Sequence, residues 1–218
     1  MTHRTAAEME SANVALMGEE LGKIYSALWQ EVAAVYFTWG EYQALFGGNP
    51  GRVDLLNKAA PSFFRLAQDT LFENVVLHIA RITDSPITMG KANLTVRRLP
   101  ALISDPDLRP LVEKCIESTE DKVSFCRDWR NRHLAHRDLS LAVSSPAEQL
   151  QPATRASVNE ALASVAEILN TVSLHYKDGS THFGFPSSMG GSVSLLEILE
   201  KGVRATEEEF DRLFGQRS

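Results

Sequence analysis

The chain has 218 residues, of which 44% are hydrophobic and 23% charged, and its net charge is −6 at pH 7. A soluble chain of this size can bury one substantial core, so we expect one domain over residues 1–218 and not two. The acidic balance, with a pI of about 5.5, argues against a surface coated with nucleic acid or held to an anionic membrane by charge. A local basic cleft remains compatible with it.

Two further features bear on where the protein works. No stretch approaches the length and apolarity of a membrane span, and the N-terminal residues lack the apolar core of a signal peptide. We therefore expect a cytoplasmic protein with no membrane partner. Cys115 and Cys126 have no metal-ligand spacing around them, so we expect both to be reduced core residues.

Helical periodicity dominates the first half of the chain. Thr5 with Glu8 forms a capping-box pattern at the start of a first helix. Apolar residues then alternate in steps of four and three, which predicts a long helix that ends in the glycine-rich run 47–51. That stripe is Leu21, Tyr25, Leu28, Val32, Val35, Trp39, Tyr42 and Phe46.

A second stripe predicts a central helix between Pro61 and Asp84, because residues before a proline avoid helical geometry and the next proline follows at position 86. His78 lies on its apolar face, where a histidine is more often a hydrogen-bonded core residue than a ligand or catalyst. The stripe consists of Phe64, Ala67, Leu71, Val75, His78 and Ile82.

The second half begins with residues 86–106, which show turn formers and no clear periodicity. Asp105 predicts the start of a helix that runs into Trp129, with a loosened or exposed polar stretch at 117–122. Thr154 predicts the cap of a further helix. Its stripe is Val158, Leu162, Val165, Leu169 and Val172.

After a loop at 177–191, Thr206 with Glu209 forms another capping-box pattern, which predicts a terminal helix that opens there. The chain therefore contains four or five main helices, with no strand alternation and no internal repeat. This pattern predicts an all-α fold, a helical bundle.

The segment Arg127 to Asp138 reads RDWRNRHLAHRD and reverses the sign of the surrounding charge. Its four Arg, two His and two Asp require an explanation: either carboxylates neutralise the cations, or the cations meet an anion such as a phosphate. Asp128 and Arg132 are four residues apart, a spacing suited to an ion pair on a helix.

The sequence lacks the signature motifs of the common nucleotide-binding, hydrolase and zinc sites. The sequence contains no Walker loop, dinucleotide fingerprint, nucleophile elbow or zinc-binding helix pattern. A metal at His133 and His136 is not expected, because four neighbouring arginines would repel the cation. We expect no cofactor.

An imidazole beside guanidinium groups suits a different reaction. Attack of an RNA 2′-hydroxyl on its own phosphate needs a base, an acid and positive charge on the phosphorane, but no metal. On an ideal helix Arg130 and His136 point about 120° apart, since each residue adds roughly 100°. They converge only if the helix ends or turns near Leu134, or if one reaches across to a second subunit.

Arg130, five intervening residues and His136, with Asn131 directly after the arginine, resemble the signature of the HEPN superfamily. The phrases WRNRHLAHRD and LHIARITD resemble its AbiU-like branch, which is named after phage abortive-infection proteins. The resemblance covers roughly residues 15–175, which would form the domain core, with 177–218 as a C-terminal loop and helical extension.

The resemblance implies a helical bundle that homodimerises and brings two motifs into one cleft. In active members this cleft is a metal-independent ribonuclease that acts as a toxin or in phage defence. His136 would be the general acid or base, Arg130 would bind the scissile phosphate, and Asn131 would orient either group. Auxiliary contact with phosphate or RNA falls to Arg127, Arg132, His133 and Arg137.

The resemblance also leaves alternatives open. Many members are non-catalytic RNA-, nucleotide- or protein-binding scaffolds, and in that case the cluster would close a helix end at a subunit interface. An antitoxin or regulatory protein is a further expected partner. In HEPN toxins controlled by a nucleotidyltransferase, a tyrosine often lies two residues after the histidine; this chain has Asp138 there, which argues against such control.

Overall fold

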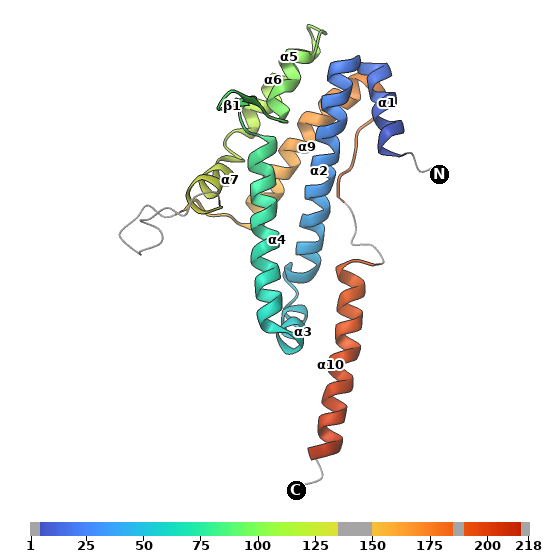
Figure 1. The fold of residues 1–218 in the computed structure, drawn as a ribbon, viewed down its shortest axis with the longest axis vertical. Helices are drawn as coiled ribbons and strands as arrows, with labels where there is room; N and C mark the ends of the chain where they lie inside the picture. The colour runs from blue at the N-terminus through green and yellow to red at the C-terminus, as the bar shows by residue number, and fades with distance from the viewer. Residues whose placement is uncertain (1–4, 135–149, 185–189, 215–218) are drawn as a thin grey trace. The chain divides into compact units, whose positions relative to one another are not determined.

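The computed structural model describes residues 5–134, 150–184 and 190–214, and it confirms the all-α fold. Figure 1 traces the elements along the chain. The α-helices are α1 (Ala6–Met17), α2 (Glu19–Phe46), α3 (Pro50–Ala59), α4 (Pro61–Ile82), α5 (Leu99–Leu102), α6 (Leu108–Thr119), α7 (Ser124–Trp129), α9 (Arg155–Lys177) and α10 (Ser192–Phe214). The other elements are the 3₁₀ turn η1 (Val96–Arg98), the π-helical turn η2 (Arg130–Leu134), and the strands β1 (Ile87–Thr88) and β2 (Lys91–Ala92).

Side-chain caps set several helix starts as the sequence predicts. Thr5 accepts from the backbone N–H of Glu8, whose carboxylate accepts in return from the Thr5 N–H at 2.7 Å. Thr154 caps α9 with Ser157 as the reciprocal partner. These contacts satisfy amide groups that a helix N-terminus leaves without an intrahelical acceptor.

The chain divides into two compact units, which we call unit 1 (residues 1–35 and 75–183) and unit 2 (residues 36–74 and 184–218). The division falls inside α2 and α4, so each of these helices contributes one part to each unit. The expectation of a single domain stays a prediction.

The core of unit 1 is built from the predicted stripes. Leu28, Val32, Val75 and Leu169 are fully buried, and the whole α9 stripe is buried with them. α6 packs along α9, and α1 and η1 also contact α9. At Gly22 a Cβ atom would lie 2.5 Å from the Cα of Val14, so α1 and α2 approach more closely than any other residue there would allow.

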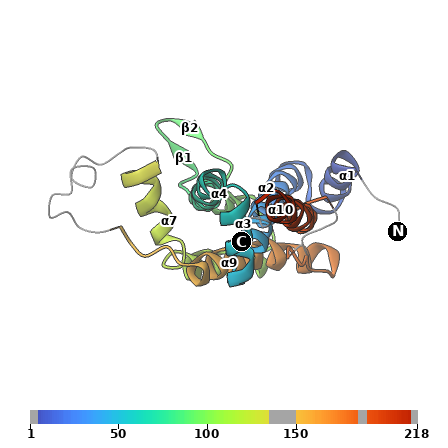
Figure 2. The same cartoon turned by 90° about the horizontal axis from the view of Figure 1, so that it is seen from below.

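Unit 2 pairs α3 with α10, which lie beside each other in Figure 2. Its small core contains Leu45, Leu56 and Phe64, with Leu196 and Leu199 of α10 packed against it. The start of α10 is held by α2, because the Glu41 carboxylate accepts from the backbone N–H of Ser192 at 2.6 Å and from its hydroxyl. A carboxylate at a helix N-terminus is favourable, since the N–H groups and the helix dipole point toward it.

Two helix boundaries differ from the sequence prediction. The predicted capping box of Thr206 and Glu209 is wrong, because α10 already begins at Ser192 and the Thr206 hydroxyl donates to the Gly202 carbonyl inside the helix. The predicted helix from Asp105 to Trp129 is interrupted between Thr119 and Ser124, within the polar stretch where the sequence indicated loosening. The unassigned residues after α4 form the β1–β2 hairpin, η1 and α5.

Candidate functional site

The basic cluster lies where a short α-helix continues into a π-helical turn. α7 ends at Trp129, and the chain continues as the π-helical turn η2 from Arg130 to Leu134. In a π-turn the hydrogen bonds join residues five apart, and such turns are frequent at functional sites. The 120° separation estimated for an α-helix therefore does not apply to this segment. His136, Arg137 and Asp138 lie outside the described residues, so convergence on His136 stays a prediction.

Two side chains position the guanidinium of Arg130. Its Nη1 donates to Asp84 Oδ2 at 2.5 Å, and its Nε donates to Asn131 Oδ1 at 3.0 Å. The side chains of Arg130 and Asp84 are 22% and 24% exposed, so this ion pair is largely shielded from solvent. Among the described residues, the Nη2 group of Arg130 has no acceptor, which leaves one face of the guanidinium available to an anion.

Arg127 belongs to a second ion-pair network in which cations outnumber carboxylates. Glu120 accepts from Arg127 Nη2 at 2.7 Å and also pairs with Arg97 of η1. The Nε of Arg127 is buried without a hydrogen-bond partner among the described residues. One carboxylate thus serves two guanidinium groups, and the site keeps a local positive excess.

Arg132 pairs with Asp128 at 3.3 Å, as the four-residue spacing predicts. Asp128 also accepts from the backbone N–H of Gln151 at 2.8 Å, and the indole of Trp129 donates to the Gln151 carbonyl at 2.9 Å. His133 packs edge-on against Trp129, with 5.6 Å between ring centroids. These contacts fasten α7 to the position where the described chain resumes after the cluster.

The phrase LHIARITD contributes to the same region from the end of α4. Its Arg81, Ile82 and Asp84 line a cavity of about 240 Å³, together with Glu31 of α2 and residues 92–94, which begin at the end of β2. Its His78 faces that cavity's Glu31, with 3.4 Å between Nε2 and Oε2. Asp84 joins the two parts of the site, since it lines the cavity and holds Arg130.

His78 is partly buried, as the apolar stripe indicates, but its hydrogen bonding is incomplete. Its Nδ1 is buried and has no partner among the described residues. Burial lowers the pKa of this imidazole and Arg81 lowers it further, against the opposing effect of Glu31. The lowered pKa favours the neutral imidazole, which carries its proton on one of its two ring nitrogens.

Neither cysteine is suited to nucleophilic chemistry. Both are free thiols; Cys126 is buried, and Cys115 is partly buried with its sulfur 3.5 Å from the Thr171 hydroxyl. Burial raises the pKa of the Cys126 thiol far above its ordinary value, which keeps it protonated and unreactive. Across the described ranges, no group of three His, Cys, Asp or Glu side chains is placed to hold a metal ion.

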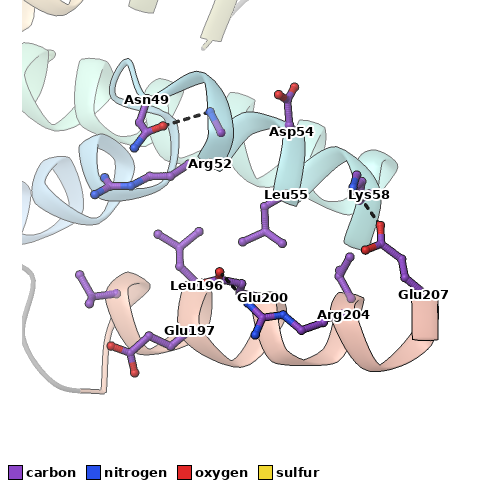
Figure 3. A pocket seen from close by; sticks show the side chains of 13 residues that line it. Asn49, Arg52, Asp54, Leu55, Lys58, Leu196, Glu197, Glu200, Arg204 and Glu207 are labelled. Atoms are coloured by element: carbon purple, nitrogen blue, oxygen red, sulfur yellow. Dashed lines mark hydrogen bonds and ion pairs between the residues drawn. The ribbon is translucent and has the colours of Figure 1, made fainter. Parts of the chain in front are cut away.

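A second, larger cavity of about 570 Å³ lies between α3 and α10 in unit 2. Figure 3 shows two ion pairs along it, with Lys58 directed at Glu207 and Arg204 at Glu200. The side chains of both pairs are more than half exposed, and none of the predicted site residues lines this cavity. It resembles a solvated seam between two helices more than a reaction centre.

Sequence reasoning missed the partners that position the cluster. The sequence identifies Asp84 only as a helix end, and Glu120 carries no distinguishing motif. Asp84 follows Arg81 by three residues and closes the phrase LHIARITD, and this was the one available signal. The phrase supported a resemblance, but its side-chain roles required the fold.

The all-α fold and the half-buried arginine at the head of the Arg/His motif are the features expected of a HEPN-type protein. The family model described as HEPN AbiU2 matches residues 18–191, and the chain belongs to this family. Comparison with curated proteins and with solved structures gives no match. No described helix is both long and apolar enough to cross a membrane.

Proposed function

We propose that the protein is a metal-independent endoribonuclease of the HEPN type that acts in phage defence or as a toxin. The observation that carries this proposal is the state of Arg130. Asp84 and Asn131 hold two of its nitrogens, while Nη2 has no acceptor among the described residues. A guanidinium fixed in this way meets a phosphate with little loss of side-chain entropy.

The proposed reaction needs no group beyond the chain and the RNA. A base takes the proton of the 2′-hydroxyl, the 2′-oxygen bonds to phosphorus, and the bond from phosphorus to the 5′-oxygen breaks as an acid protonates that oxygen. The products are a 2′,3′-cyclic phosphate and a 5′-hydroxyl. His136 acts as the acid or base, Arg130 stabilises the charge on the phosphorane, and Asn131 holds Arg130 in orientation.

The remaining cations have auxiliary roles in this proposal. Arg127 and Arg132 already have carboxylate partners, so each would contact RNA while still paired. His133 and Arg137 would extend the same basic surface. We further propose a homodimer with two motifs in one cleft, controlled by an antitoxin or another regulatory protein.

The same ion pair favours a second candidate, a catalytically silent HEPN scaffold that binds RNA, a nucleotide or a protein. In that function Arg130 and Asp84 would close the ends of α4 and α7 and would meet no substrate. The possible functions depend on different residues. An enzyme needs the imidazole of His136, a phosphate binder mainly needs Arg130, and a scaffold needs only stability and assembly.

The deciding experiment is cleavage of a mixed-sequence RNA by the purified full chain in excess chelator, with product ends tested for 2′,3′-cyclic phosphate. Arg130→Ala and His136→Ala are compared with Arg65→Ala, which removes an exposed arginine of unit 2 that pairs with Asp69. We expect cleavage by the parent and by Arg65→Ala, and a loss of at least 100-fold in the two motif variants.

Circular dichroism and sedimentation of each variant separate lost chemistry from lost folding or assembly. Equal activity in all four proteins would indicate a contaminant and overturn the proposal. Inactivity of the folded parent, combined with loss of the dimer in Arg130→Ala, would support the scaffold function in its place.

A further inference from the structure

The cavity beside Asp84 has the composition of a small-ligand subsite. It is bounded by Glu31 from α2, by the end of α4, and by residues 92–94, and its volume is about 240 Å³. Ile82, Ala92 and Leu94 give it apolar wall, while Glu31, Arg81 and Asn93 supply polar groups. Binding sites for planar organic ligands commonly combine apolar surface with a few placed polar atoms.

The orientation of Asn93 is fixed by its neighbours. Its Nδ2 donates to the Ser85 carbonyl and to the Thr88 hydroxyl, both at 2.8 Å. Its two amide hydrogens are therefore used within the hairpin region, and its Oδ1 accepts no hydrogen bond from the described residues. Asn93 thus presents an acceptor in the cavity lining.

Glu31 is a second acceptor, held on one side. His78 Nε2 lies 3.4 Å from Oε2, and Oε1 has no donor among the described residues. A carboxylate is an acceptor only and can receive two parallel hydrogen bonds. Burial lowers the pKa of His78 and so favours the neutral imidazole, whose Nε2 lies against one side of the Glu31 carboxylate.

Arg81 completes the lining with the opposite sign. Within the described part of the chain, its guanidinium makes no ion pair or hydrogen bond, and the residue is exposed at the cavity. A complementary ligand would carry adjacent hydrogen-bond donors on one edge, facing the two acceptors, and adjacent acceptors on another edge, facing the arginine.

Guanine is the nucleobase with that arrangement. Its N1–H and N2–H₂ groups form an adjacent pair of donors for a carboxylate, and its O6 and N7 are the acceptors that arginine recognises most often. Adenine and cytosine place an acceptor beside their amino group, and uracil places a single N–H between two carbonyls. The carboxylate would meet an acceptor lone pair in each of these.

We propose that this cavity is a guanine-specific subsite for single-stranded RNA, adjacent to the phosphate held by Arg130. Glu31 receives the N1–H and N2–H₂ donors, Arg81 donates to O6 and N7, and Asn93 Oδ1 accepts the remaining amino hydrogen. Asp84 links the subsite to the phosphate position, because it lines the cavity and binds Arg130 at 2.5 Å. The role of this subsite in choosing the cleavage position rests on the proposed ribonuclease function.

Nucleotide binding tests the subsite without any cleavage. The full chain is titrated in chelator with 5′-GMP, 5′-IMP, 5′-AMP, 5′-CMP and 5′-UMP, and dissociation constants are taken from calorimetry or amide chemical shifts. We expect GMP to bind at least about 10-fold more tightly than AMP, CMP or UMP, with IMP in between because it lacks the N2 amino group. Equal affinity for the five nucleotides overturns the proposal.

Glu31→Gln is the main variant, since it keeps the shape and replaces one acceptor by a donor. We expect it to weaken GMP binding about 5- to 100-fold, in line with the loss of a bidentate base contact, and to leave AMP binding within about twofold. Glu113→Gln, an exposed glutamate of α6, is the matched control and should change neither. Glu31→Asp separates loss of the carboxylate from a general effect of substitution at this position. It keeps the carboxylate and should keep the preference for GMP over AMP.

His78 is a positioning residue in this scheme, so its test is selectivity and not affinity alone. We expect His78→Gln to reduce the ratio of GMP to AMP affinity while the folded protein persists. If Glu31→Gln kept the GMP selectivity of the parent, the assignment of the subsite to this cavity would be wrong.

The outcomes separate this inference from the ribonuclease proposal. Selective GMP binding by a chain that cuts no RNA supports the subsite and overturns the nuclease. Cleavage without a preference for guanosine, in a chain that does not select GMP, overturns the subsite and leaves the nuclease standing. If both hold, sequenced products should show guanosine at one side of the cut, and Glu31→Gln should lose that preference.

Discussion

Units 1 and 2 use charge in different ways. In unit 1 the ion pairs of Arg130 with Asp84 and of Arg127 with Glu120 have side chains exposed by about a third or less. In unit 2 the pairs of Lys58 with Glu207 and of Arg65 with Asp69 are more than half exposed. Exposed pairs contribute little to stability, whereas half-buried pairs restrict side-chain geometry. These ion pairs therefore restrict side-chain geometry more strongly in unit 1 than in unit 2.

The units also differ in how far they cover their apolar side chains. Of the fifteen exposed large hydrophobic residues in the described chain, ten belong to unit 2. They include Phe210, Leu213 and Phe214 at the end of α10, each more than half exposed. Unit 1 buries most of its large apolar side chains, whereas unit 2 has a small core and exposes more of them to solvent. The four predictions below test this contrast.

The largest effect is expected in the core of unit 1. Leu169→Ala removes a fully buried side chain from α9 and should lower the free energy of unfolding by about 2–5 kcal/mol. The corresponding change in unit 2, Leu199→Ala, removes a partly buried side chain of α10 and should cost only about 1 kcal/mol. Chemical denaturation followed by helical circular dichroism measures both. Equal costs would mean that the two cores are equally well packed.

The next effect concerns the ion pair that positions the site. Asp84→Ala leaves the guanidinium of Arg130 shielded and without its carboxylate, and it should destabilise the protein by about 1–3 kcal/mol. The double variant Asp84→Ala with Arg130→Met removes both charges and should recover part of this loss. The equivalent test in unit 2, Asp69→Ala, should cost less than about 0.5 kcal/mol because that pair is exposed.

A thermodynamic cycle over the single and double variants gives the coupling between Asp84 and Arg130. A coupling no larger than that of Arg65 with Asp69 would contradict the contrast between the units. It would also weaken the role of Asp84 as the residue that holds Arg130.

Sequence alone predicts the parts of this protein that depend on local rules. The helices α2, α4 and α9 and the caps at Thr5 and Thr154 follow from periodicity and from neighbouring side chains, and the structure confirms them. The α9 stripe is fully buried, whereas Ala67, Leu71 and His78 of the α4 stripe are only partly buried. The pair of Asp128 with Arg132 follows from a four-residue spacing in the same way.

Long-range partners do not follow from such rules. Arg130 is 46 residues from Asp84 in the sequence, and the phrase that Asp84 closes does not indicate which residue Asp84 binds. The failure at Thr206 has a related cause: a capping-box pattern is local, but Glu41, 151 residues from Ser192, fixes the start of α10. Contacts over such distances decide which of several local possibilities the chain adopts.

The third effect should stay within unit 2. Glu41→Gln weakens the acceptor for the N–H and hydroxyl of Ser192, and we expect a local loss of about 1 kcal/mol at the start of α10. Hydrogen exchange should become faster in α10 and remain unchanged in α9. Glu197→Gln, an exposed glutamate of α10, is the control. Equal acceleration in α9 would show that the two units unfold together.

The smallest effect is a pH dependence that arises in unit 1 from His78. Burial lowers the pKa of His78 below its ordinary value of about 6.5, with Arg81 acting in the same direction and Glu31 against it. As the pH falls below about 6.5, the unfolded chain binds a proton that the native imidazole does not yet bind, so stability decreases until the lower native pKa is reached. Above that pH range His78 does not contribute to the pH dependence of stability.

His78→Gln removes this titration. Between about pH 7.5 and pH 5, the melting temperature of the parent should therefore decrease more than that of the variant. A parent that loses no more stability than His78→Gln over this interval would place the imidazole in contact with water.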